Sequence, residues 1–229
     1  MNKFIYAIVL ILFSHFSFSQ EAAVSSKSLS EQESQQIIDA SVKTKFGIKF
    51  PIFRVYEFND KTGKNYLVLT ERDYLKDSLK VKNDTIKAYL FNVKSNQLIL
   101  QNTVKDFINP TKGEKNIWFF TKYLQLNDID GDGIIEPVIV YGTLAANGLE
   151  DGRVKIITVY KNKKSAIRHQ SGTLDFERGL QLDKTFYQLP AAVQTEVISL
   201  MEKMSNQNSI IFPAGWQKAF SEKKTVIKE

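Results

Sequence analysis

The segment with the clearest chemical signal runs from Asp128 to Glu136 and reads DIDGDGIIE. Asp128, Asp130, Asp132 and Glu136 stand at its positions 1, 3, 5 and 9, with glycines at positions 4 and 6. A hard cation such as Ca²⁺ binds about six to eight oxygen atoms, and glycines let the backbone turn through conformations closed to other residues. The spacing therefore predicts a calcium-binding loop whose ligands are these four carboxylates and the carbonyl of Ile134 at position 7.

The charge of this segment supports the same interpretation. Its four acidic side chains repel one another unless a cation lies between them, although the whole chain has a formal charge of +6. A ligand set of oxygens alone disfavours zinc and copper, which prefer His or Cys, and a wide loop suits Mg²⁺ poorly. The alternative is a plain polar turn that binds nothing, because Asp-Gly is a favoured pair in hairpin turns.

The residues after the loop separate it from an EF-hand. An EF-hand needs a bidentate Glu at position 12, where its second helix begins, but this chain has Ile139 there. Pro137 favours an extended conformation for the residue before it, and residues 137–141 (PVIVY) have the composition of a strand. We therefore expect a strand–loop–strand arrangement.

The sequence DIDGDGIIEPVIVYG, residues 128–142, resembles the calcium loops of FG-GAP and VCBS-type β repeats. In that pattern, acidic or Asn side chains at positions 1, 3, 5 and 9 hold calcium between two strands. Asp128, Asp130, Asp132 and Glu136 match these positions, with Glu in place of Asp at position 9. The resemblance implies one Ca²⁺ site and no complete propeller, because the motif occurs once. The general layout is also similar to a family of exported flavobacterial proteins linked to surface-polysaccharide biosynthesis, which implies no catalytic residues.

The N-terminal sequence predicts where the protein is located. Lys3 is followed by ten apolar residues, 4–13, and Ser17 and Ser19 provide small side chains for cleavage before Gln20. This order is typical of a secretory signal peptide, residues 1–19. We expect an exported protein that is periplasmic, on the cell surface or secreted, and the sequence has no other apolar run long enough to span a bilayer. The absence of Cys excludes a lipoprotein anchor, disulfides, Cys-ligated metals and thiol nucleophiles.

Charge also limits the partners. The basic residues are interspersed with acidic ones, so we do not expect nucleic-acid binding. The exported context makes a cell-envelope protein or a glycan the partner to expect.

Catalytic signals are weak. His169 is the only histidine after the predicted cleavage site, and no G-x-S-x-G motif accompanies it. Paired carboxylates for glycoside hydrolysis meet in space and not in sequence, so Glu150 with Asp151, and Asp175 with Glu177, are pairs by proximity alone. Asp151 with Gly152 is better explained by a turn, although Asp151 could also lie near the metal loop and support it from outside. A calcium-dependent hydrolase of envelope polysaccharide therefore remains the alternative to a non-enzymatic protein.

Four aromatic residues could stack on sugar rings, although positions of this kind are more often buried in a core. They are Trp118, Tyr123, Tyr141 and Trp216.

The elements that would position the loop predict an α+β fold. Ser30 and Glu33 form a capping-box pattern that begins a helix over residues 31–46, ended by Gly47. Residues 51–180 consist of β-branched and aromatic runs separated by polar turns, which predicts hairpins in an antiparallel meander. Its strands should pair residues 51–58 with 65–70, 85–93 with 97–103, and 153–160 with 165–170. Residues 117–126 and 137–141 should flank the acidic loop.

The C-terminal part returns to helix. Pro190 suits a first helical position, and apolar residues follow at helical spacing: Val193, Val197, Leu200, Met201 and Met204. Pro213 should open a last short helix. We expect the N-terminal and C-terminal helices to pack on the sheet. The domain prediction is a flexible leader over residues 20–29, a single α+β domain over residues 30–222, and a solvated tail over residues 223–229.

Overall fold

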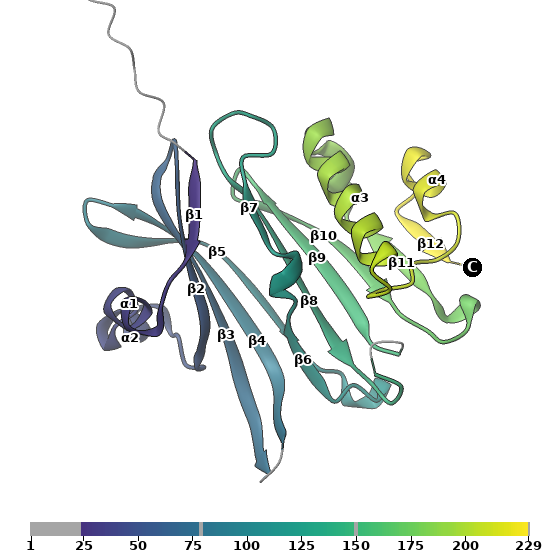
Figure 1. Ribbon diagram of the computed structural model, residues 1–229, viewed down its shortest axis with the longest axis horizontal. Helices are drawn as coiled ribbons and strands as arrows, with labels where there is room; N and C mark the ends of the chain where they lie inside the picture. The colour runs from purple at the N-terminus through teal and green to yellow at the C-terminus, as the bar shows by residue number, and fades with distance from the viewer. Residues whose placement is uncertain (1–23, 78–79, 149–150, 229) are drawn as a thin grey trace, which may run out of the picture.

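The computed structural model describes residues 24–77, 80–148 and 151–228 (Figure 1). The predicted signal peptide lies outside the described residues. The fold is α+β, with mostly antiparallel strands. In chain order the strands are β1 (Ser25–Ser28), β2 (Ile52–Asp60), β3 (Gly63–Asp77), β4 (Lys80–Lys94), β5 (Gln97–Phe107), β6 (Asn116–Phe119), β7 (Gln125–Asn127), β8 (Glu136–Leu144), β9 (Arg153–Tyr160), β10 (Lys163–Gln170), β11 (Gly179–Leu182) and β12 (Val226–Lys228). The α-helices are α1 (Glu31–Ile37), α2 (Ala40–Phe46), α3 (Ala191–Asn206) and α4 (Trp216–Ser221).

The strands form two sheets of antiparallel neighbours, in agreement with the predicted α+β fold built on antiparallel meander sheets. The first has the order β1-β2-β3-β4-β5, and the second has the order β12-β11-β10-β9-β8-β6, with β7 also pairing β8. The short helices α1 and α2 lie on the outer side of the first sheet, and α3 and α4 lie on the outer side of the second (Figure 1). The order of layers is therefore helices, sheet, sheet, helices.

Three apolar cores separate these layers. Alternation along the strands sends Leu67, Leu69 and Ala88 from the first sheet toward Ile139 and Ile157 from the second, which makes the middle core. The opposite face of the first sheet packs against the N-terminal helices. The opposite face of the second sheet packs against the C-terminal helices, where the predicted apolar stripe of α3 is fully buried.

The predicted hairpins are confirmed. Strand β2 pairs with β3, β4 with β5, and β9 with β10, all antiparallel. The expected strand over residues 117–126 is instead interrupted by a 3₁₀ turn, η2 (Thr121–Tyr123), which separates β6 from β7. Both β6 and β7 pair with β8, so residues 116–127 form two short strands along one neighbouring strand and not one long strand.

The N-terminal helix differs from its prediction. The capping box is present, with Ser30 N donating to Glu33 Oε2 at 2.8 Å, and Gly47 ends the helical region in a left-handed conformation. Between these points the predicted helix breaks into α1 and α2, because the Asp39 side chain accepts a hydrogen bond from Val42 N at 2.8 Å and begins a second helix. Apolar periodicity alone did not reveal this internal cap.

Both predicted irregular ends contain strands. Residues 25–28, in the expected leader, pair with β2 as β1. Residues 226–228, in the expected tail, pair with β11 as β12. Polar composition predicted a flexible leader and a solvated tail, but the open edge of each sheet provides backbone hydrogen-bond partners for an extended segment.

Among the described residues, no helix combines the length and apolar character needed to cross a bilayer.

Candidate metal centre

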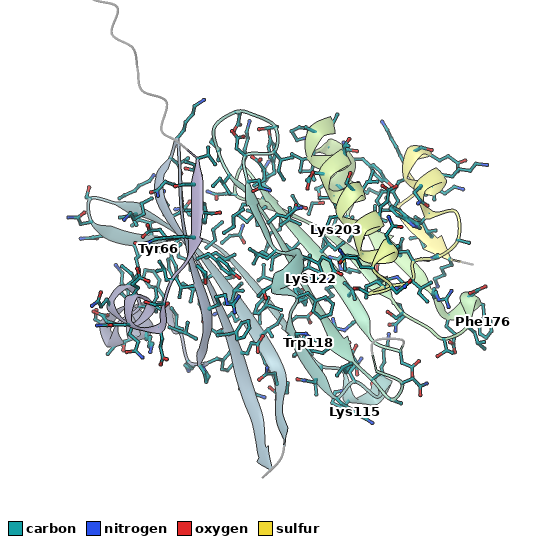
Figure 2. All side chains as sticks on the ribbon, viewed as in Figure 1. Tyr66, Lys115, Trp118, Lys122, Phe176 and Lys203 are labelled. Atoms are coloured by element: carbon teal, nitrogen blue, oxygen red, sulfur yellow. The ribbon has the colours of Figure 1, made fainter. Side chains whose placement is uncertain are left out.

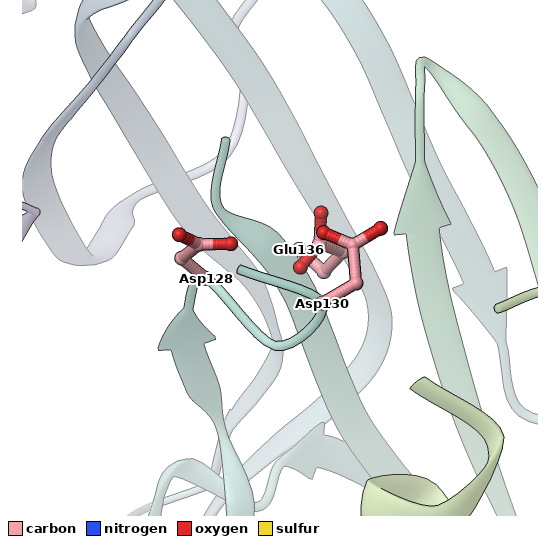
Figure 3. A group of neighbouring side chains, drawn as sticks. All are labelled: Asp128, Asp130 and Glu136. Carbon is pink, nitrogen blue, oxygen red and sulfur yellow. The ribbon is translucent and has the colours of Figure 1, made fainter. Parts of the chain in front are cut away.

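Three of the four predicted carboxylates meet at one point. One oxygen each from Asp128, Asp130 and Glu136 lie within 4.8 Å of one another. Figure 3 shows the carboxylates of Asp130 and Glu136 next to each other, with the Asp128 carboxylate directed toward them. Calcium–oxygen bonds measure about 2.3–2.6 Å, so ligands on opposite sides of one ion lie about 5 Å apart. The spacing of the three oxygens therefore suits a single Ca²⁺ ion.

The position of these residues follows from the pairing of β7 with β8. Asn127, the last residue of β7, lies opposite Glu136, the first residue of β8. The acidic segment is the connection between these strands, as the strand–loop–strand interpretation predicted. Its two ends are therefore held at the distance of neighbouring strands, and Asp128 and Glu136 are brought together by the sheet.

Backbone N–H groups fix the orientation of the carboxylates inside the loop. Asp128 Oδ1 accepts from Gly131 N at 2.9 Å, and its Oδ2 accepts from Gly133 N at 2.9 Å. Asp130 Oδ1 accepts from Asp132 N at 3.2 Å. These bonds need a tight backbone, and both glycines have positive φ angles, 77° and 84°. The two glycines thus let the backbone turn through left-handed conformations, as predicted from the sequence.

Glu136 is the buried member of the site. Its residue is 2% exposed, and its Oε2 accepts a hydrogen bond from Ile129 N at 2.8 Å. Burial raises the pKa of Glu136 to about 7, helped by the negative charges of Asp130, Asp132 and Asp128. A buried carboxylate beside three other acids is unfavourable when ionised. A divalent cation between them would remove this penalty.

Asp132 is not among the three converging carboxylates. Its Oδ1 accepts from Ile134 N at 2.9 Å, and its Oδ2 lies 3.7 Å from Lys161 Nζ. Lys61 Nζ donates to the Asp132 carbonyl at 2.9 Å. Two lysines from other turns thus approach this residue, one from the β2–β3 turn and one from the β9–β10 turn. The predicted ligand role of Asp132 and that of the Ile134 carbonyl both stay predictions.

Two residues that contact the acidic loop, Asp60 and Lys61, belong to no motif recognised in the sequence. Asp60 Oδ2 accepts from Ile135 N at 3.2 Å, and Lys61 N donates to the Gly133 carbonyl at 2.8 Å. Asp60 is the last residue of β2, and Lys61 follows it in the β2–β3 turn of the other sheet. The sequence identified this segment only as a turn, and no local signal shows that it lies against the acidic loop.

The fit to a cation is good on three counts. The ligands are hard carboxylate oxygens, which suit Ca²⁺ better than zinc or copper. One ligand is buried and would otherwise hold an uncompensated charge. The remaining carboxylates are already oriented by backbone hydrogen bonds. When bound, the ion would supply the positive charge that the three acids lack.

The described residues do not assemble the catalytic alternatives. His169 is 2% exposed and packs edge-on against Phe212, with ring centroids 4.9 Å apart. Neither of its ring nitrogens has a hydrogen-bond partner among the described residues. A triad histidine needs both a nucleophile and an orienting acid, so the described surroundings of His169 do not form one.

The paired acids also have structural roles. Asp175 pairs with Arg178 at 2.5 Å, and Glu177 Oε2 accepts from Leu174 N at 2.9 Å. Asp151 accepts from Asn147 N at 3.1 Å. It lies between β8 and β9, at the opposite end of β8 from the acidic loop, so it does not support the metal site. Glu150 lies outside the described residues.

The predicted aromatic residues are largely core. Tyr123, Tyr141 and Trp216 are buried. Trp118, labelled in Figure 2, is half-buried. Its ring centroid lies 5.2 Å from that of Phe120. Tyr123 and Trp216 belong to the core beneath the C-terminal helices and Tyr141 to the middle core, so the four residues form no shared platform for a sugar ring.

No protein-family model, curated protein sequence or solved structure matches this chain.

Proposed function

We propose that this protein is an exported, non-enzymatic calcium-binding protein that acts as a binding or accessory module of the cell envelope. The observation that carries the calcium part is the convergence of Asp128, Asp130 and buried Glu136 within 4.8 Å. The export part rests on the N-terminal sequence, and the envelope partner, a protein or glycan, rests on that context.

The position of the loop supports a structural role for the ion. The three acids join β7 to β8, and hydrogen bonds from Ile135 and Lys61 connect the same loop to the β2–β3 turn. Calcium would therefore stabilise the loop and, through it, the contact between the two sheets at this end of the molecule.

We expect calcium to raise the melting temperature of the full chain. If free calcium is about one hundred times its dissociation constant, the free energy of unfolding rises by about 2.7 kcal/mol. For a domain of this size that corresponds to a shift of about 5–10 °C. The measurement is thermal unfolding in calcium and in EDTA, with calcium binding followed by calorimetry.

Two variants make this test specific. Asp130→Asn removes one converging carboxylate and should abolish the difference between calcium and EDTA. Asp175→Asn removes an exposed aspartate outside the loop and should keep the full difference. Equal melting temperatures of the wild-type protein in calcium and EDTA would contradict the proposal.

A further inference from the structure

A cavity of about 390 Å³ opens between the two sheets beside the acidic loop. Its apolar lining includes Phe58, Leu90 and Val159, which belong to the middle core. Its outer lining comes from the β2–β3 turn, the loop and the β9–β10 turn. The volume is within the usual range for small-molecule sites, about 300–1,000 Å³.

The inner face of the first sheet changes from apolar to polar at this cavity. Asn65 lies opposite Phe58 and also opposite Asn92 in neighbouring strands, and both asparagines are buried. Asp60 is buried as well, and its Oδ1 accepts from Thr62 N at 2.7 Å and from Asn65 Nδ2 at 3.2 Å. Buried polar groups of this kind are normally fully hydrogen-bonded.

One atom of this cluster has no partner. Asn92 is 4% exposed, and its Oδ1 is without a hydrogen bond in the described part of the chain. The orientation of its amide is fixed, because Nδ2 donates to Asn65 Oδ1 at 3.0 Å and to the Thr62 carbonyl at 3.2 Å. A buried acceptor without a donor is costly, and Asn92 lines the cavity. Asn92 thus places an unpartnered, buried acceptor in the wall of the cavity, where an O–H or N–H group would complete its hydrogen bonding.

The charge of the cavity changes from its inner end to its mouth. The buried end contains the Asp60 carboxylate and the Asn92 oxygen, which disfavour an anion. At the mouth, exposed Lys94 and Lys161 line the cavity. The Lys94 side chain has no hydrogen bond or ion pair with any described residue, and Lys161 Nζ lies 3.7 Å from Asp132 Oδ2. A complementary ligand has a hydrogen-bond donor at one end and a negative charge at the other.

We propose that this cavity binds a small hydroxylated carboxylate, such as a sugar acid. A hydroxyl group of the ligand donates to Asn92 Oδ1, and its carboxylate lies near Lys94 at the mouth. The acidic loop contributes Ile134, Ile135 and Pro137 to the lining. The site therefore adjoins the proposed calcium site, but its recognition groups come from β4 and not from the carboxylates that would hold the ion.

The test is calorimetric titration of the full chain with glucuronate in a calcium buffer. Glucose keeps the hydroxyls and lacks the carboxylate, and acetate has the carboxylate without hydroxyls. We expect saturable binding of glucuronate and affinities at least about tenfold lower for glucose and acetate. An absence of glucuronate binding, or equal binding of glucose, would overturn the proposal.

Variants locate the site. Asn92→Leu and Lys94→Gln should each weaken glucuronate binding by about tenfold or more, because each removes one recognition group. Lys112→Gln removes an exposed lysine outside this cavity and should bind as the wild type does. Lys94 is exposed, so its variant remains informative if Asn92→Leu fails to fold. Unchanged binding in Lys94→Gln would overturn the assignment.

Failure of the calcium proposal is distinguishable from failure of this one. In EDTA, a protein without a calcium effect on its melting temperature can still bind glucuronate in the cavity. If Asp130→Asn abolishes glucuronate binding while Asn92→Leu and Lys94→Gln retain it, the carboxylate is binding calcium in the loop and the cavity proposal is wrong. Calcium-induced stabilisation that persists in Lys94→Gln, together with lost glucuronate binding, supports both.

Discussion

At the scale of single residues, two buried titratable groups show how environment decides protonation. Glu136 and His169 are each 2% exposed. Burial penalises the charged form of both, so it raises the pKa of Glu136 to about 7 and lowers that of His169 to about 4. Glu136 lies beside other acids that a cation could neutralise together with it. His169 lies against Phe212 and stays neutral.

His169 should make the folded state sensitive to acid. In the unfolded chain the pKa of His169 is about 6.5, and in the native state it is about 4. Between these pH values the unfolded state binds a proton at His169 and the native state does not. The free energy of unfolding should therefore fall as the pH drops from 6.5 toward 4, by about 2–3 kcal/mol from this residue.

Urea unfolding of the wild-type protein and His169→Leu at pH 7, 6, 5 and 4.5 measures this term. The variant should lose this part of the acid sensitivity, so it should gain stability relative to the wild type as the pH falls. A difference between the two proteins that stays constant with pH would contradict the role of His169.

At the scale of elements, close backbone approaches decide which strands can pair. Gly152, before β9, lies so near β8 that a Cβ atom there would be 1.9 Å from the Thr143 carbonyl oxygen. Gly179, at the start of β11, has room, because a Cβ atom there would lie 3.5 Å from its nearest neighbour, the Ile227 carbonyl oxygen. The two glycines look alike in the sequence. Only the approach of the β8 backbone distinguishes them.

Gly152→Ala should destabilise the protein by at least about 2 kcal/mol, because the new methyl group forces β8 and β9 apart. Gly179→Ala introduces the same methyl group at ordinary contact distance and should change stability by less than about 1 kcal/mol. Denaturant unfolding of both variants tests this contrast. Equal effects would show that the backbones approach less closely than described.

At the scale of the whole molecule, an ion-pair network joins the two sheets at the end opposite the acidic loop. Arg153 on β9 contacts Glu114 at 2.7 Å and Asp106 on β5 at 2.8 Å. Lys155 also pairs with Asp106 at 2.7 Å. Burial alone would raise the pKa of Asp106, but hydrogen bonds from these two cations outweigh it and lower the pKa. The sheets are thus held by apolar packing in the middle and by polar contacts toward both ends.

Arg153→Met should cost about 2–4 kcal/mol of unfolding free energy, because it leaves buried Glu114 and Asp106 with fewer partners. Arg168→Met breaks a pair with Asp183 in which both side chains are more than a third exposed, and should cost less than about 1 kcal/mol. Denaturant unfolding compares them. A loss for Arg168→Met as large as that for Arg153→Met would contradict the importance of the network.

Local patterns in the sequence determined much of this protein. Strand alternation predicted the hairpins, helical spacing predicted the buried stripe of α3, and the acidic spacing predicted which loop brings carboxylates together. These features depend on residues near one another in the chain. The sequence also located Asp128, Asp130 and Glu136, because β7 and β8 are joined by the loop itself.

The tertiary structure decided the rest. It split the strands into two sheets, paired the polar ends of the chain as edge strands, and placed Asp60 and Lys61 against the loop. It also directed Asp132 toward lysines from two other turns and left Asn92 Oδ1 without a donor beside a cavity. These arrangements depend on which segments meet across the middle core. Short-range periodicity cannot predict which segments meet, because their contact results from burying the apolar faces of strands that are distant in the sequence.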